Sequence, residues 1–176
     1  MKSTGVIKRI DDLGRIVIPK EIRKNLRIRV GENLEVYIDG DSIVLKKFSV
    51  VSRISDLAQE LADSMHIFTK YNIIIMDTND IIACSGKLKK DIINKSISDD
   101  MRFLIEKREK MLQNHIKELK LLDDKVINCS YADSTIIVSG EAIGLIMIVS
   151  ENDKLTDFEM RLVEIVSLFL TKYLEE

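Results

Sequence analysis

Residues 14–27 read GRIVIPKEIRKNLR, which joins a β-branched run, the single proline of the chain and a basic helical pattern. The β-branched run at 14–18 predicts a strand, because such residues favour a pleated backbone. Pro19 has no N–H to give to a sheet, and its fixed φ suits the first turn of a helix. The stretch therefore predicts a strand that passes directly into a short helix.

The helix predicted after Pro19 has two different faces. Ile22 and Leu26 lie four residues apart and share the inner face. The outer face carries cations at the spacing i, i+3, i+4 and i+7, namely Lys20, Arg23, Lys24 and Arg27. We therefore expect an amphipathic helix that is cationic on its outer side.

Further strands flank this stretch. TGVIKRI at 4–10 and GRIVI at 14–18 lie on either side of a turn-forming cluster at 11–14, which predicts a first hairpin. Alternation over 34–38, the DGD turn and SIVLKK at 42–47 predict a second one. About 50 residues bury too little apolar surface to fold easily alone, so a second copy of the chain is expected to complete the sheet.

Charge is unevenly spread along the chain. Residues 1–29 hold nine Lys and Arg against three acids, a net charge of +6. The net charge is +4 over residues 1–52 and −6 over residues 53–176. This asymmetry indicates two domains, 1–52 and 53–176, of which the first has an anionic partner.

Residues 1–48, in MKSTGVIKRIDDLGRIVIPKEIRKNLRI and ENLEVYIDGDSIVLKKF, resemble the AbrB family of bacterial transition-state regulators. The resemblance implies an all-β swapped-hairpin barrel with a short helix, formed by a homodimer that binds double-stranded DNA. It implies DNA contacts from Lys8, Arg9, Arg15, Arg23 and Lys24, to which we add Lys20 and Arg27 from the same helix face. Relatives commonly have Arg at positions 8 and 24, and lysine cannot form a bidentate contact, so the sequence preference is expected to differ.

The second domain shows a mixed pattern of helices and strands. An apolar stripe over 54–65 predicts a helix, and YNIIIMD and IIACS predict strands at 71–77 and 81–85. A helix is expected after Ser98, on Met101, Leu104 and Ile105 and further on at Met111 and Leu112, and two more strands over 134–150. Thr156 and Glu159 form a capping box, with Leu155 and Met160 as a hydrophobic staple, for a long last helix.

This order of elements predicts an α+β domain, with an antiparallel sheet covered on one face by the first and last helices. It resembles the GAF family of small-molecule sensors, which implies a pocket near Cys84, Ser85 and the segment after Gly86. The pocket is expected to be either occluded or occupied by an effector that the sequence does not identify. Helices of facing subunits could form a bundle, so a tetramer through this domain is a further expectation.

With GKLKKDIINKSIS at 86–98, the whole chain resembles a family of transcription regulators of spore-forming bacteria, which implies control of sporulation genes. CSGK at 84–87 lacks the glycine of a phosphate-binding loop, and His66 and His115 have no second ligand nearby. Cys84 and Cys129 lie in apolar surroundings, as reduced buried thiols do. We therefore expect no enzyme, cofactor or metal site.

No apolar run approaches the roughly 20 residues needed to cross a bilayer, and no secretory signal is evident, so a cytoplasmic protein without a membrane partner is expected. Two alternatives to DNA binding remain. Antitoxins share the AbrB-type fold and bind a protein partner, although their tails are usually short and disordered. An enzyme using the GAF-like pocket is the other.

Overall fold

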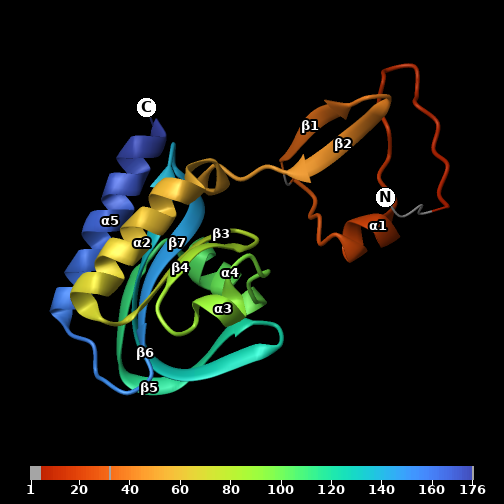
Figure 1. Ribbon diagram of the computed structural model, residues 1–176. Helices are drawn as coiled ribbons and strands as arrows, with labels where there is room; N and C mark the ends of the chain where they lie inside the picture. Colours follow the sequence, from red (N-terminus) through yellow and green to blue (C-terminus); the bar gives the residue numbers. More distant parts are fainter. Residues whose placement is uncertain (1–4, 32, 176) are drawn as a thin grey trace. The chain divides into compact units, whose positions relative to one another are not determined.

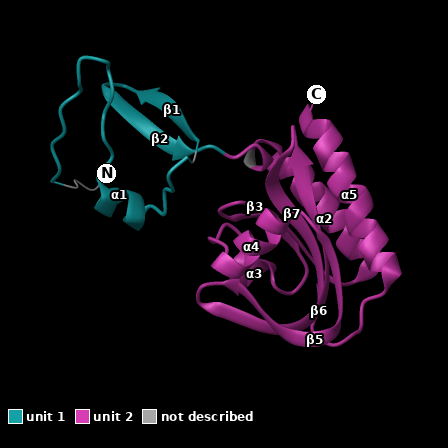
Figure 2. Cartoon of the chain, turned by 180° about the vertical axis from the view of Figure 1, so that it is seen from behind, with its two compact units in different colours: residues 1–48 teal, residues 49–176 magenta. Residues whose placement is uncertain are grey.

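The computed structural model describes residues 5–31 and 33–175, and the chain divides into two compact units, Met1–Phe48 and Ser49–Glu176 (Figure 2). The start of the first predicted strand, Thr4, lies outside the described residues. The 3-10 helix η1, Val51–Ile54, belongs to the second unit and contains the predicted domain boundary after residue 52. Each unit is described by itself below.

The first unit contains one helix and one hairpin, which are α1 (Lys20–Asn25), β1 (Leu34–Asp39) and β2 (Ser42–Lys47). Pro19 is the N-cap of α1, with φ −58°, as its fixed ring geometry requires. The strands pair antiparallel, and Gly40 takes a positive φ of 57° in the turn between them. The predictions of a helix after Pro19 and of the second hairpin are therefore confirmed.

The first predicted hairpin is only partly present. Its turn forms, because the Gly14 N–H donates to the Asp11 carbonyl at 2.9 Å and the Asp11 N–H donates to the Arg15 carbonyl at 3.1 Å. The described residues on either side, 5–10 and 15–18, are not strands (Figure 1). The predicted strands at 4–10 and 14–18 are thus not found in the single chain. A strand needs a neighbour to take its backbone hydrogen bonds, and an isolated two-stranded ribbon is marginal at best in water.

The second unit is built on a five-stranded antiparallel sheet of strand order β4-β3-β7-β6-β5. Its strands are β3 (Asn72–Asp77), β4 (Ile81–Ser85), β5 (Lys110–Leu122), β6 (Lys125–Val138) and β7 (Glu141–Ser150). Every described residue of β3 is buried, because both faces of the sheet are covered. The α+β class with an antiparallel sheet is confirmed.

Helices cover the two faces of this sheet in different ways (Figure 1). One face packs against α2 (Ser55–Thr69) and α5 (Asp157–Glu175), with Ile73 and Ile75 of β3 in that cluster. The other face packs against α3 (Lys89–Ile92) and α4 (Asp99–Lys107), with Ile74 and Met76. The strand thus alternates its apolar side chains between two cores, which confirms that the first and last helices share one face.

One predicted element is wrong. Met111 and Leu112 were expected on a helix, but both lie in β5, which pairs with β6 from Lys110 opposite Ser134 onward. The sequence KMLQNHIKELKLL is rich in Lys, Leu, Glu and Gln, which favour helices. Pairing along the 14-residue strand β6 overrides that local preference.

The start of α5 follows its predicted cap. The Thr156 hydroxyl and backbone N–H both donate to the Glu159 carboxylate, at 2.6 and 2.8 Å, and the Phe158 N–H donates to the Thr156 hydroxyl. Leu155 is buried in the same cluster that Met160 contacts, as a hydrophobic staple requires. Within the described residues, no helix combines the length and the apolar character needed to cross a membrane.

Candidate nucleic-acid interface

Three of the predicted DNA-contacting residues surround the turn at 11–14. Lys8, Arg9 and Arg15 are all exposed. The Arg15 guanidinium donates to the Asp11 carboxylate, with Nε and Oδ2 2.8 Å apart, and the Arg15 backbone N–H donates to Oδ1 at 2.7 Å. Asp11 also accepts the Leu13 N–H, at 3.1 Å. The turn therefore fixes Arg15, while Lys8 and Arg9 lie on the segment that enters it.

The hydrogen bonds of Arg15 also set the ionisation of Asp11. The backbone N–H of Arg15 lowers the pKa of the Asp11 carboxyl most, followed by its guanidinium. The carboxylate is therefore charged well below neutral pH, and it partly neutralises one of the cations beside the turn.

The other four predicted residues belong to α1 and its C-cap region. Lys20, Lys24 and Arg27 are exposed, whereas Arg23 is half-buried and its buried Nε has no hydrogen-bond partner among the described residues. Arg27 takes a positive φ of 53° just beyond the helix, and its carbonyl accepts a hydrogen bond from the Lys47 ammonium at 3.0 Å. α1 ends at Asn25, so the predicted cationic face is correct only for Lys20, Arg23 and Lys24, and Arg27 lies beyond the helix.

Apolar side chains between these cations are not buried. No described residue of 5–48 falls in the buried class. Ile7 is 95% exposed, Val30 90% and Ile38 84%, and the inner-face residue Leu26 is 59% exposed. Ile22, the other inner-face residue, is only half-buried. A folded soluble domain normally removes such side chains from water, so this unit lacks the surface that would cover them.

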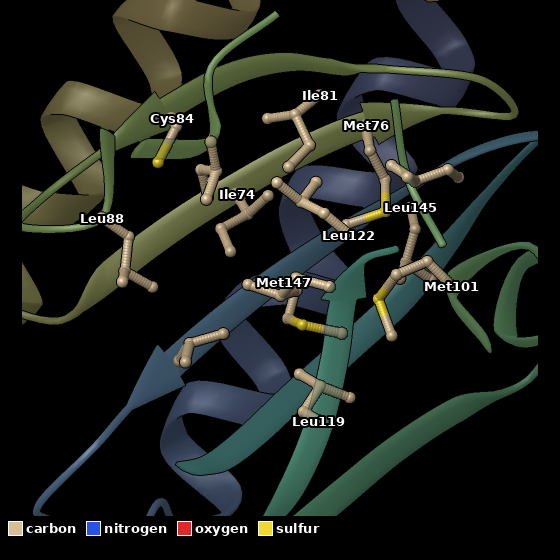
Figure 3. Packing of buried hydrophobic residues seen from close by; sticks show 14 of the residues in the cluster. Ile74, Met76, Ile81, Cys84, Leu88, Met101, Leu119, Leu122, Leu145 and Met147 are labelled. Atoms are coloured by element: carbon tan, nitrogen blue, oxygen red, sulfur yellow. The ribbon is translucent and has the colours of Figure 1, made fainter. Parts of the chain in front are cut away.

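The region of the predicted GAF-like pocket is filled in this structure. Cys84 and its neighbours from α3, α4 and β7 form a packed apolar cluster between the sheet and these helices (Figure 3). Burial raises the pKa of the Cys84 thiol to about 12, so the thiol is protonated at neutral pH. Cys129 is also free and buried, and its pKa is likewise raised to about 12 by burial.

A surface cleft of about 730 Å³ lies where β3 begins and where β4 and β7 end. Ser85, Gly86 and Lys87 line it, so part of the segment predicted to border a pocket does so. Gly86 has a φ of 110°, and a Cβ there would stand 2.6 Å from Asn72 Oδ1, which only glycine avoids. Among the described residues, no group of three His, Cys, Asp or Glu side chains could hold a metal ion.

One polar residue in the second unit was not singled out from the sequence. Asp133 lies in β6, is 1% exposed, and its Oδ1 has no hydrogen-bond partner among the described residues. Burial raises the pKa of this carboxyl to about 7. The available signal is one acid in the strand sequence KVINCSYADSTIIV, which has no other acidic residue.

Comparisons with solved structures show the fold of the second unit. The cofactor-binding GAF domain of the nutrient sensor CodY from Clostridium difficile is 12% identical, with a TM-score of 0.51, over 64% of this chain and 81% of that one. The phycocyanobilin-bound GAF domain of a cyanobacterial phytochrome is 11% identical, with a TM-score of 0.53, over 72% and 90%. The second unit therefore has a GAF-like fold.

Comparisons of sequence cover both units. Residues 7–53 match the model of the MazE bacterial antitoxin family, described as antidote-toxin recognition. The transition state regulatory protein AbrB of Bacillus subtilis (strain 168) is 40% identical over 76 residues, which are 40% of this chain and 79% of that protein. The putative transition state regulator Abh of the same organism is 50% identical over 48 residues, 27% and 52% of the two chains.

An AbrB-like N-terminal unit joined to a GAF-like unit defines a class of bacterial transcription regulators. Residues 53–175 match the family model of the C-terminal domain of stage V sporulation protein T, a transcription factor. Stage V sporulation protein T of Bacillus subtilis (strain 168) is 40% identical over 179 residues, all of both chains. The chain belongs to the stage V sporulation protein T family.

Proposed function

We propose that two copies of the first unit exchange hairpins to form one barrel, and that this barrel binds double-stranded DNA through Lys8, Arg9, Arg15, Lys20, Arg23, Lys24 and Arg27. The observation that carries the proposal is the alternation of exposed cations with unburied apolar side chains over the described residues 5–48. A second chain would cover the apolar side chains and supply the missing strand neighbours. The cations would stay on the rim, facing phosphate.

Pairing also doubles the charge. The +6 of residues 1–29 becomes +12 in a dimer, and its two-fold axis matches the symmetry of duplex DNA. Phosphate contacts from these residues would fix the orientation of the barrel, and a few contacts to base edges would give selectivity. Asp11 holds Arg15 by its backbone N–H and its guanidinium, so the direction of this cation is fixed before DNA arrives.

The second unit is proposed to change the DNA affinity of the first and to join dimers. On α5, Phe158, Ile165, Phe169 and Tyr173 follow one helix face and are each about half exposed or more. Phe158 lies with its ring centre 5.9 Å from that of Phe68 on α2. Such a stripe would be buried if the helices of two dimers packed as a bundle, which supports a tetramer.

A salt titration of the full chain tests the DNA proposal. Affinity for a duplex should fall steeply with salt, and Arg15→Ala or Arg23→Ala should reduce the slope of log K against log[salt] by about two per dimer, one phosphate contact per subunit. Lys154→Ala, an exposed lysine of the second unit, is the matched control and should leave the slope unchanged.

The alternative is a protein-binding module, and the match of residues 7–53 to an antitoxin family favours it. Such tails are usually disordered, whereas the second unit here has two packed cores. Duplex affinity that is absent in dilute buffer, or that does not change with salt or with Arg15→Ala, would favour this alternative.

A further inference from the structure

Asp133 is a buried carboxylate that the fold does not use. It is 1% exposed, and its Oδ1 is enclosed without a hydrogen-bond partner among the described residues. Burying an unpaired carboxylate costs several kcal/mol unless a partner or a proton compensates it. Because the ionised Asp133 carboxylate destabilises the folded chain, a cationic partner from outside the chain would stabilise it.

Strand register gives the direction of the Asp133 side chain. Asp133 lies opposite Met147 of β7 and Met111 of β5, and directly paired residues share one face of a sheet. Met147 belongs to the cluster between the sheet and α4, whereas the neighbouring Ala132 belongs to the cluster under α2 and α5. Asp133 therefore faces the α4 side of the sheet.

Three methionines belong to the apolar cluster on this side of the sheet. Met76, Met101 and Met147 come from β3, α4 and β7 and gather in the same space (Figure 3). Methionine has three flexible torsions and no branch, so it can move aside for a guest at less cost than Ile or Val. The core on this side of the sheet thus contains three side chains that can make room for a small apolar body.

Polar groups that could complete a site flank Asp133 along its own strand. Tyr131 and Thr135 lie two residues away on either side and share its face. The Thr135 hydroxyl donates to the Glu109 carbonyl at 3.1 Å, which leaves its oxygen free to accept. The Tyr131 hydroxyl donates to the Met111 sulfur at 3.5 Å, and both side chains are half-buried. Tyr131 and Met111 are thus partly exposed side chains next to Asp133, one on its own strand and one directly opposite it.

We propose that Asp133 is the anchor of an effector site for a small organic cation, a primary ammonium group on a short hydrocarbon body. The ammonium is positively charged and has three donors and no acceptor, so it can donate to the unpartnered Oδ1 of Asp133 and to the hydroxyl oxygen of Thr135, two residues along the same face. Its hydrocarbon body takes the place of the methionine side chains. The site rests on the proposal that the second unit changes the DNA affinity of the first, and not on how the first unit binds DNA.

The test uses the full chain at pH 8 and three probes of equal length: n-pentylammonium, n-pentanol and n-pentanoate. n-Pentylammonium should raise the unfolding temperature of the second unit in a saturable way, and the other two should not. Asp133→Asn should weaken n-pentylammonium binding roughly tenfold to hundredfold, the value of a charge-assisted hydrogen bond. Asp124→Asn, an exposed carboxylate in the turn before β6, should bind as the parent does.

A second variant keeps the proposal falsifiable if Asp133→Asn perturbs the fold. Met111→Ala shortens the partly exposed side chain opposite Asp133 and should bind n-pentylammonium faster than the parent. Equal binding by Asp133→Asn and the parent, an equal shift with n-pentanol, or no shift with n-pentylammonium would overturn the site. DNA binding measured on the same samples reports separately on the first unit, so either proposal can fail without the other.

Discussion

The Asp11 carboxylate binds Arg15 twice, through the backbone N–H at 2.7 Å and through the guanidinium Nε at 2.8 Å. An acid therefore sits at the centre of a cationic segment and orients one of its arginines. The carboxylate lowers the net charge of the segment by one. The hydrogen bonds of the same carboxylate also hold the turn, and they fix Arg15 in a segment that has apolar residues on either side.

This arrangement predicts a pH titration of the turn. Because the pKa of Asp11 is lowered below 3.8 in the folded chain, its hydrogen bonds are fully present above that pH. They should be lost only as the pH falls through the lower, folded value. The amide shifts of Leu13 and Arg15 in NMR spectra should therefore move below pH 3.8, and Asp11→Asn should abolish this movement. A midpoint at or above 3.8 would show that the turn does not bind the carboxylate.

Asp133 predicts the opposite dependence for the second unit. Its pKa is raised to about 7 in the folded chain from 3.8, so between these values the folded state holds the extra proton. The free energy of unfolding should then fall as the pH rises through this window, by up to about 1.4 kcal/mol per pH unit. Tyr131 faces the same region, and burial foremost raises its pKa, so it stays neutral throughout.

Urea unfolding followed by circular dichroism at several pH values measures this dependence. Asp133→Asn should be more stable than the parent at pH 8, and the difference should shrink toward acid pH. If the free energies of unfolding of the two chains changed in parallel with pH, Asp133 would be ionised in the folded chain and its charge would be compensated by other groups.

Ser98 predicts a local stability effect. Its hydroxyl accepts the Met101 N–H at 3.2 Å as the N-cap of α4, and it donates to the Lys120 carbonyl of β5. Ser98→Ala should lower the free energy of unfolding by about 1–2 kcal/mol, because a cap is lost and a carbonyl is left without its partner. Thermal unfolding of the second unit measures the loss.

Ser96→Ala is the matched control for Ser98→Ala. The Ser96 hydroxyl makes an exposed hydrogen bond to Asp80, so its removal should stay within about 0.5 kcal/mol. Equal losses in the two variants would argue against the capping role of Ser98.

The apolar stripe on α5 predicts the size of the assembly. Ile165 is 64% exposed in the single chain, and Ile165→Glu would place a charge in the proposed bundle. The variant should sediment as a dimer under conditions where the parent sediments as a tetramer. Asn114→Glu, at an exposed position of β5, adds the same single negative charge away from α5 and should not alter the mass. A dimeric parent would remove the stripe from consideration as an interface.

Sequence reasoning succeeded where the information is local. Thr156 and Glu159 define a cap within four residues, and β3 is an uninterrupted apolar run bounded by turn residues. It failed at β5, where helix-forming side chains are held in a strand by pairing with β6, a contact between distant parts of the chain. The segments 5–10 and 15–18 are a different case, since their residues favour strands but form none in the described single chain.

The candidate sites divide in the same way. The cations at 8–27 can be found from composition and spacing, because exposed charge needs no tertiary context to be recognised. Asp133 could not be assigned, because its meaning depends on which face of the sheet it points to and on whether another chain segment supplies a donor. The face of the sheet on which Asp133 lies can be determined only once Met147 and Met111 are known to lie opposite it.

The uncovered apolar side chains of the first unit have a consequence for dosage. If the DNA-binding barrel forms only from two chains, its concentration varies with the square of the concentration of free chain while that concentration is low. Halving the synthesis of the chain would then remove about three quarters of the DNA-binding dimer. A gradual change in the amount of chain would therefore cause a steeper change in promoter occupancy, even without a bound effector.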